Sequence, residues 1–335
     1  MSAQSFSPLV DGFGRTIRYL RISVTDRCDL RCRYCMAEDM TFLPRKDILS
    51  LEEIALLADH FVARGVRKIR LTGGEPLVRS GIDELTRRIG RHIGAGLDEL
   101  TMTTNAMRLA EHADALAAAG IRRLNVSVDT LDRDMFAHIT RHGDLDRVLA
   151  GISAAKAAGI AIKVNMVALA GLNDDQLLPM LRWCDAGGHD LTLIETMPLG
   201  EVEGDRTDHY VPLHAFIAPL RAAHAIQPIA HQSGGPARYF AVDGHRVKLG
   251  LITPISHNFC GDCNRIRMTV QGRIYMCLGQ DDHVDLMAAL RGGDAADLDR
   301  LIANALAGKP ERHDFQIDAP GRTAAVERHM SVTGG

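Results

Sequence analysis

The stretch Thr25-Asp-Arg-Cys28-Asp-Leu-Arg-Cys32-Arg-Tyr-Cys35 bears most directly on the fold and chemistry of this sequence. Its three cysteines have the spacing C-x3-C-x2-C, and no fourth cysteine lies nearby. A four-iron cluster can be held at three corners by close thiolates, which leaves one iron open to a ligand. A closed zinc site needs a fourth ligand, and no histidine lies within twenty residues of Cys28 or Cys35. The spacing therefore predicts a metal site and favours an open-cornered iron–sulfur cluster over three unlinked, buried cysteines.

The cysteine run follows the first of six extended stretches that alternate with helical ones up to about residue 225. This repetition predicts parallel strands joined by helical crossovers, in a partial barrel or a doubly wound sheet. The extended stretches are 19–25, 68–72, 99–104, 123–129, 161–168 and 190–197, and the helical ones are 51–64, 82–93, 108–119, 145–158 and 174–184.

The side-chain pattern within the strands decides between these two architectures. Strands buried on both faces read as continuous apolar runs, but the first five stretches here alternate apolar and polar residues. With a period of two, one face meets the helices and the other is polar. Five polar faces cannot form a dry core. The sequence therefore predicts an α/β fold, a partial, open (β/α)6 TIM-like barrel whose lumen holds a polar ligand; the facing of the sixth stretch is left open.

The pattern changes after about residue 230. Ser233-Gly-Gly-Pro236 is typical of a linker or loop, and hairpins are predicted to turn at Asp243-Gly244 and Gln271-Gly272. Helices are expected near 283–291 and 295–307. We therefore divide the chain into a barrel, 11–230, and a C-terminal α+β extension, 231–335.

A second cysteine group lies in this extension. Cys260-Gly-Asp-Cys263 precedes Cys277 by fourteen residues, and the hairpin at 271–272 brings Cys277 back beside Cys263. A second cluster with an open iron and a zinc site completed by His257 are equally compatible with this spacing. The remaining cysteine, Cys184, is expected to be a buried apolar residue.

Thr72-Gly-Gly-Glu-Pro76 closes the second strand. Two glycines at the carboxyl end of a parallel strand allow a close approach of backbone to a ligand, although an ordinary strand–helix turn is the simpler explanation for the motif alone. It lies at the same barrel end as the Cys28 loop, where such folds place their ligands.

Basic side chains converge on the predicted lumen. Inward-pointing arginines from different strands are harder to explain as a solvated surface than as a ligand site, because each isolated buried cation would cost several kcal/mol. A polyanion such as a triphosphate would satisfy them all. The five residues are Arg21, Arg70, Lys163, Arg265 and Arg267.

Composition narrows the remaining possibilities. The 335 residues are 46% hydrophobic and 24% charged, as in globular proteins, and the net charge of −3 attracts neither nucleic acid nor a membrane. Aromatic residues make up 4%, too few for a base-stacking platform. With no signal peptide and no spanning apolar run, a cytoplasmic location is expected, where seven cysteines point to metal rather than disulfides.

The residues also carry a family resemblance. The first cysteine run, with Tyr34 before its last cysteine, resembles the radical S-adenosylmethionine (SAM) superfamily, and further motifs resemble its GTP 3′,8-cyclase family, which acts in molybdenum cofactor biosynthesis. These motifs are Asp11-Gly-Phe-Gly-Arg15, Leu20-Arg-Ile-Ser-Val-Thr-Asp-Arg-Cys28, Leu71-Thr-Gly-Gly-Glu-Pro76, Thr103-Thr-Asn105, Ser256-His-Asn-Phe-Cys-Gly-Asp-Cys-Asn-Arg-Ile-Arg267 and the terminal Gly334-Gly335. The likeness runs from about residue 11 to the end.

The resemblance implies two [4Fe-4S] clusters and a role for each motif. It implies that Cys28, Cys32 and Cys35 hold the cluster that binds SAM, and that Cys260, Cys263 and Cys277 hold an auxiliary cluster facing the guanine of GTP. Expected SAM contacts are Tyr34, Gly74, Ser127 and Met197; expected GTP contacts are Arg21, Arg70, Thr103, Lys163, Arg265 and Arg267; Arg265, Arg267, Gly334 and Gly335 are expected to act in catalysis. The sequence departs from the family pattern at Asp29, Ala37, Ala106, where glycine is usual, and Val332-Thr333 before the final glycines.

The implied enzyme is a lyase that uses a 5′-deoxyadenosyl radical to convert GTP to (8S)-3′,8-cyclo-7,8-dihydroguanosine 5′-triphosphate. Expected partners are a flavodoxin- or ferredoxin-like electron donor, the downstream enzyme that rearranges the product, and a second copy in a homodimer. A radical SAM peptide maturase and a zinc-binding interaction module without turnover are the rival interpretations.

Overall fold

The computed structural model describes residues 8–200, 208–257, 259–293, 295–313, 315 and 326–334. Its framework is a 12-stranded sheet in the order β12-β11-β10-β1-β2-β3-β4-β5-β6-β9-β8-β7. The six strands of the predicted barrel are β1 (Tyr19–Ser23), β2 (Lys68–Thr72), β3 (Glu99–Thr104), β4 (Arg123–Ser127), β5 (Ala161–Val167) and β6 (Asp190–Ile194). The others are β7 (Ile226–Pro228), β8 (Arg238–Val242), β9 (Lys248–Ile252), β10 (Arg265–Met268), β11 (Arg273–Tyr275) and β12 (His283–Asp285).

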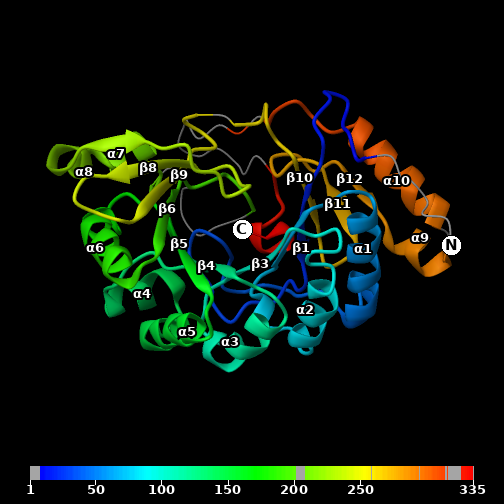
Figure 1. Cartoon of the computed structure of the whole chain (residues 1–335), viewed down its shortest axis with the longest axis horizontal. Coiled ribbons are helices and arrows are strands. Elements are labelled where there is room, and N and C mark those ends of the chain that lie inside the picture. The colour runs from blue at the N-terminus through cyan, green and yellow to red at the C-terminus, as the bar shows by residue number, and fades with distance from the viewer. Residues whose placement is uncertain are drawn as a thin grey trace.

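The helices between the barrel strands lie on the outside of this curved sheet (Figure 1). Five of them were predicted, α1 (Leu51–Ala63), α2 (Ile82–Gly90), α3 (Leu109–Ala118), α5 (Leu145–Ala157) and α6 (Leu177–Gly187), whereas α4 (Arg133–Thr140) was not. The later helices are α7 (Leu213–Phe216), α8 (Ala218–Ala223), α9 (Met287–Gly292), α10 (Ala295–Ala307) and α11 (Met330–Thr333). Within the described ranges, no helix is both long enough and apolar enough to cross a membrane.

Strands β1 to β6 are parallel neighbours, as predicted. The C-terminal segment extends both edges of the same sheet: β10 lies parallel to β1, and β9 lies parallel to β6. In the part of the chain that the structure describes, β12 and β7 end the sheet without pairing with each other, so the barrel stays open. The predicted fold class is confirmed.

The alternation within the strands has the predicted consequence. The apolar residues of β1 to β5, such as Leu20, Ile69 and Val164, belong to the hydrophobic core shared with the helices. Their polar neighbours line two internal cavities described below. The open question of β6 is also answered: Leu191 and Leu193 join the core, and Ile194 lines both cavities.

Beyond residue 230, both predicted hairpins form, as the antiparallel pairs β8–β9 and β10–β11. The helix predicted near 283–291 is partly wrong, because its first residues form β12 and the helix begins only at Met287. In β12, Val284 pairs with Ile274, so an edge-strand position outweighs local helical preference. The division near residue 230 stays a prediction, since one sheet runs through both parts.

Candidate functional site

Two cavities open within the barrel. The first, of about 170 Å3, is lined by the first trio, Cys28, Cys32 and Cys35. The second, of about 120 Å3, is lined by the second trio, Cys260, Cys263 and Cys277. The two cavities are neighbours, because four residues line both of them: Asn165, Ile194, Met197 and Met330.

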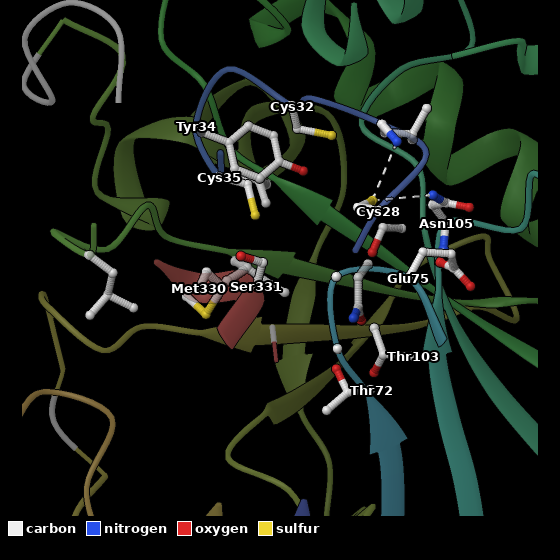
Figure 2. A pocket seen from close by; sticks show the side chains of 18 of the residues that line it. Cys28, Cys32, Tyr34, Cys35, Thr72, Glu75, Thr103, Asn105, Met330 and Ser331 are labelled. Atoms are coloured by element: carbon white, nitrogen blue, oxygen red, sulfur yellow. Dashed lines mark hydrogen bonds between the residues drawn. The ribbon is translucent and has the colours of Figure 1, made fainter. Parts of the chain in front are cut away.

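The first trio lies on the loop that follows β1, and its side chains gather at one end of the first cavity (Figure 2). The Cys28 Sγ accepts hydrogen bonds from the Leu30 backbone N–H at 3.4 Å and from the Asn105 Nδ2 at 3.8 Å. Asn105 also donates to the Asp29 carboxylate at 2.6 Å. Asn105, directly after β3, thus fixes the loop that follows β1, across the intervening strand β2.

The protonation of these thiols bears on what they can hold. Burial raises the pKa of Cys28, Cys32 and Cys35, the last to about 11, although a hydrogen bond from the Ser331 backbone works against the rise at Cys35. Three buried thiolates would repel one another without a positive partner. Cluster irons supply that charge, and all three sulfurs are free thiols. The residues therefore fit an iron–sulfur cluster.

The glycines of the Thr72–Pro76 motif hold this loop in place. The Gly74 N–H donates to the Thr25 carbonyl at 2.9 Å, and the Glu75 N–H donates to the Arg27 carbonyl at 2.8 Å. A Cβ on Gly74 would stand 2.3 Å from the Arg27 carbonyl oxygen. The close backbone approach predicted for the motif is thus made to the chain just before Cys28, and only glycine permits it.

Glu75 has a role that the sequence reasoning missed. Its carboxylate is buried and accepts hydrogen bonds from the Leu77 and Asn105 N–H groups and from the Thr104 hydroxyl. Burial raises its pKa to about 7, although these hydrogen bonds oppose the rise. The signal was present in the quoted motif, whose glutamate joins the ends of β2 and β3.

Tyr34 and Asp129 form a second buried polar contact above the first trio. The Tyr34 hydroxyl donates to the Asp129 carboxylate at 2.8 Å, and the Val167 N–H donates to its other oxygen at 2.8 Å. Burial raises the pKa of Asp129 to about 6 and that of Tyr34 above its usual value. Tyr34 is thereby oriented along the wall of the first cavity.

The C-terminal end of the chain enters the barrel. Helix α11 packs beside β1, and Met330 and Ser331 line the first cavity opposite the first trio (Figure 2). Gly334 follows with φ +74° against the Thr72 side chain. Gly335 lies outside the described residues.

Ala106 occupies a position where the family usually has glycine. It has a φ of +62° and is fully buried. Glycine adopts this left-handed conformation without the steric cost that alanine bears. The chain thus has alanine in a backbone conformation that favours glycine.

The second cavity contains a row of like charges. In the register of the parallel strands, Arg21 pairs with Arg70 on one side and with Arg267 on the other. Two residues earlier along the same strands, Tyr19 pairs with Arg265. The side chains that line the cavity from this register are those of Tyr19, Arg21, Arg70, Arg265 and Arg267. Burial, with the neighbouring arginines, lowers the pKa of Arg21 well below its usual range and that of Arg267 to about 10.

Several donors of this row have no hydrogen-bond partner among the residues that the structure describes. They are buried and face a cavity, as expected of a site built for a polyanion. The unpartnered atoms are Arg21 Nε and Nη2, Arg70 Nε and Arg267 Nε.

Lys163 completes the basic wall from β5. Its Nζ donates to the Tyr239 hydroxyl at 2.6 Å, and Tyr239 donates to the Ser233 Oγ at 2.8 Å. Burial, then Arg70 and Arg123, lowers the pKa of Lys163 to about 7. Ser233 belongs to the stretch predicted as a linker, which here closes one end of the second cavity.

The second trio differs from the first in its charge environment. Although burial raises the pKa of Cys263, the cations Arg265 and Lys309 outweigh it and lower the pKa overall. All three cysteines line one cavity, whereas His257, the fourth ligand of the zinc alternative, does not line it. Among the described residues, no three His, Cys, Asp or Glu side chains gather closely enough for a single metal ion. The thiolates of a four-iron cluster bind separate irons, so three cysteines that line one cavity are compatible with such a cluster.

The structure groups the predicted site residues as follows. Tyr34, Gly74, Ser127 and Met197 line the first cavity, as does Thr103, which was expected to contact the other ligand. Arg21, Arg70, Lys163, Arg265 and Arg267 line the second, together with Met197. Cys184 is buried in the core, as expected. Glu75, Asp129, Asn105, Lys309 and Met330 were not assigned roles from the sequence.

Two family models match consecutive parts of the chain. Residues 22–184 match the model of the radical SAM superfamily, and residues 189–315 match the model Molybdenum Cofactor Synthesis C. Two structures of SuiB from Streptococcus suis, one bound to S-adenosylmethionine, share the fold with TM-scores of 0.57 and 0.55 at 18% and 19% identity. They cover 87% and 86% of this chain, which in turn spans 68% and 67% of SuiB.

Curated relatives are far more similar. A protein of Rhizobium etli (strain CIAT 652) named GTP 3′,8-cyclase is 56% identical over 329 residues, covering 98% of this chain and 94% of the relative. Proteins of the same name from Rhizobium meliloti and Rhodopseudomonas palustris are 56% and 55% identical, each across 98% of this chain and 95% and 96% of their own. On this similarity, the chain belongs to the GTP 3′,8-cyclase family of the radical SAM superfamily.

Proposed function

We propose that this protein is a radical SAM lyase that converts GTP to (8S)-3′,8-cyclo-7,8-dihydroguanosine 5′-triphosphate in molybdenum cofactor biosynthesis. The observation that carries the proposal is the shared wall of the two cavities. One cavity holds a trio of cysteines with no fourth cysteine among its described lining residues, and the other joins a second trio to a row of buried cations, three of which have guanidinium nitrogens without a hydrogen-bond partner in the described part of the chain. The radical source and the nucleotide thus have adjoining sites.

We assign SAM and one [4Fe-4S] cluster to the first cavity, and GTP and a second [4Fe-4S] cluster to the second. The first trio's cluster, when bound, supplies the electron that cleaves SAM to methionine and a 5′-deoxyadenosyl radical. Tyr34, Gly74, Ser127 and Met197 would hold SAM beside it. Thr103 lines the same cavity, so its proposed contact with GTP requires GTP to reach past the shared wall.

The residues of the second cavity would orient GTP. Arg21, Arg70 and Lys163 would bind the triphosphate. Its negative charge would relieve the repulsion among these cations, and this relief would strengthen binding. Arg265 and Arg267 lie next to the second trio in sequence and space, so they would bridge phosphate and guanine. With both ends held, the ribose C3′ and the guanine C8 stay close to bonding geometry. Transfer of the C3′ hydrogen atom to the 5′-deoxyadenosyl radical would let C3′ bond to C8, and one electron from the external donor with one proton would then complete the 7,8-dihydro product.

The shared wall would control where the reaction occurs. Met197 and Met330 present apolar side chains to both cavities. They would exclude water from the space where hydrogen transfer takes place. Gly334 and Gly335 are proposed to act in catalysis, as the family resemblance implies.

The test is turnover of GTP labelled with deuterium at C3′ by the anaerobically reconstituted protein, with SAM and dithionite. Mass spectrometry is expected to find deuterium in 5′-deoxyadenosine and one cyclised product per 5′-deoxyadenosine. Unlabelled 5′-deoxyadenosine with intact GTP would refute the assignment. A peptide maturase would likewise leave GTP unchanged.

The remaining proposals concern organisation and partners. We propose a barrel part, 11–230, and a C-terminal part, 231–335, that supplies the second trio and the tail. A flavodoxin- or ferredoxin-like electron donor, a downstream enzyme that rearranges the product and a homodimer follow from the family resemblance, and a cytoplasmic location is proposed from the sequence. Size-exclusion chromatography with light scattering tests the homodimer.

A further inference from the structure

Lys309 lies behind the second trio. It lies two residues after the end of α10, is only 2% exposed, and is absent from the described residues that line the two cavities. Its Nζ donates to the Met276 carbonyl at 2.5 Å and to the Cys263 Sγ at 3.6 Å. Because Met276 precedes Cys277, one amino group ties together the two chain segments that carry Cys263 and Cys277.

The third cysteine of the trio is tied to the same place by Arg15. The Arg15 Nη1 donates to the Cys260 carbonyl and to the Glu311 carbonyl, both at 2.8 Å, and the Nη2 donates to the Pro310 carbonyl at 2.6 Å. Asp11 holds the Arg15 Nε at 2.6 Å, which accounts for the Asp11–Arg15 motif of the sequence. Residues 309–311 are therefore the common anchor of all three cysteine segments.

The position of Lys309 also separates it from the other cations near the trio. Arg265 and Arg267 reach the trio from the cavity, where a polyanion would take up their charge. Lys309 approaches Cys263 from the protein side and has no access to a nucleotide. When a polyanion fills the second cavity, the charge of Lys309 remains directed at the Cys263 sulfur, because Lys309 does not line that cavity.

We propose that Lys309 is a positioning residue that preorganises the second trio and raises the reduction potential of the cluster it holds. The inference rests on the proposed second cluster. A charged N–H donor to a ligating sulfur stabilises the more negative, reduced cluster, in which one added electron increases the charge on the sulfurs. The same donor, bonded to Met276, keeps the hairpin of β10 and β11 at the correct distance from Cys263.

The test compares Lys309→Met with Lys309→Arg, which keeps the charge and donors. Lys156→Met serves as a matched control, because Lys156 also bridges to a carbonyl, that of Gly187 at 2.6 Å, but lies on the exposed surface. EPR-monitored redox titration of the reconstituted holoenzyme gives the potentials, and the first cluster is identified by the change of its signal on adding SAM.

We expect Lys309→Met to shift the oxidation equilibrium of the second cluster about tenfold, a fall of about 59 mV for a one-electron couple, with the first cluster unchanged. Lys309→Arg should shift the potential of the second cluster less, and Lys156→Met should not shift it. An unchanged second potential in Lys309→Met would overturn the inference.

If Lys309→Met does not retain the second cluster, amide hydrogen exchange of the cluster-free protein decides the question. Faster exchange at 260–263 and 273–278 than in Lys156→Met supports the positioning role, and equal exchange rejects it. A wild-type protein that holds roughly four rather than eight irons per chain would instead refute the proposed second cluster.

Discussion

Gly334 lies so close to Thr72 that a Cβ on residue 334 would stand 2.2 Å from the Thr72 Cγ2. This contact joins the C-terminal end of the chain to the carboxyl end of β2, directly before the Gly73-Gly74 turn. The Gly334 φ of +74° adds a second reason for glycine at this position.

Gly334→Ala is therefore expected to displace the tail and to reduce formation of the cyclised product at least tenfold, while both clusters assemble. Product and iron per chain are the measurements. Gly293→Ala is the matched control. Gly293 has a similar φ of +75°, but a Cβ added there would have open space among the described residues. Thr72→Ser removes the nearest methyl group and should partly restore the Gly334→Ala variant; a purely additive double variant would contradict a direct clash.

Gly74→Ala is expected to disturb the first trio and leave the second intact. The added Cβ would lie 2.3 Å from the backbone oxygen of Arg27, one residue before Cys28, and backbone cannot yield there without moving the loop. Iron per chain should fall from roughly eight to roughly four atoms after reconstitution. Gly292→Ala, at the end of α9, is the control and should retain full iron, because an added Cβ there has open space among the described residues. Equal iron in the two variants would argue against this role of Gly74.

Binding of GTP should weaken as the pH rises through about 7, because the pKa of Lys163 is lowered to about 7 in the ligand-free protein. Above that pH the amine is neutral and must take up a proton to bind the triphosphate. Calorimetry in buffers of different ionisation enthalpy will measure this uptake. Lys163→Arg, which stays charged, should bind with less proton uptake, and identical uptake in both proteins would exclude Lys163 as the group.

The same lowered pKa has a consequence for stability. The unfolded chain holds the Lys163 proton up to its ordinary pKa near 10, so the unfolded state binds more protons between about pH 7 and 10. In the protein without GTP, the titration of Lys163 therefore increases the free energy of unfolding as the pH rises through this window. Lowering the pH to 7 reverses this increase.

Arg21→Met is expected to weaken GTP binding at least tenfold and yet to stabilise the ligand-free protein. Arg21 is buried between Arg70 and Arg267 in the strand register, so its removal relieves repulsion and desolvation. A gain of about 1–4 kcal/mol in the free energy of unfolding is the expected range for replacing a buried charge by an apolar side chain. Denaturant unfolding of the cluster-free protein measures it, and the exposed Arg18→Met is the control. If Arg21→Met instead lowers the free energy of unfolding, repulsion and desolvation of Arg21 do not destabilise the ligand-free protein.

Much of this protein could be predicted from local sequence. The period of two in 19–25 and 161–168 depends only on the alternation of side chains along a strand, and it correctly separated core residues such as Leu20 from luminal ones such as Arg21. The hairpin at Gln271-Gly272 likewise follows from residues that favour the turn. Helix α4 and the edge strand β12 were missed because short elements depend on their neighbours more than on their own sequence.

The sequence by itself determined the strand faces, the two cysteine trios and the basic residues of the lumen, because spacing and alternation are properties of neighbours along the chain. Only the tertiary structure decided that Arg21, Arg70 and Arg267 form one row, that Glu75 joins β2 to β3, and that Lys309 and Arg15 anchor the second trio. Register between strands and contacts across hundreds of residues arise from packing of the whole sheet, and no local pattern encodes them.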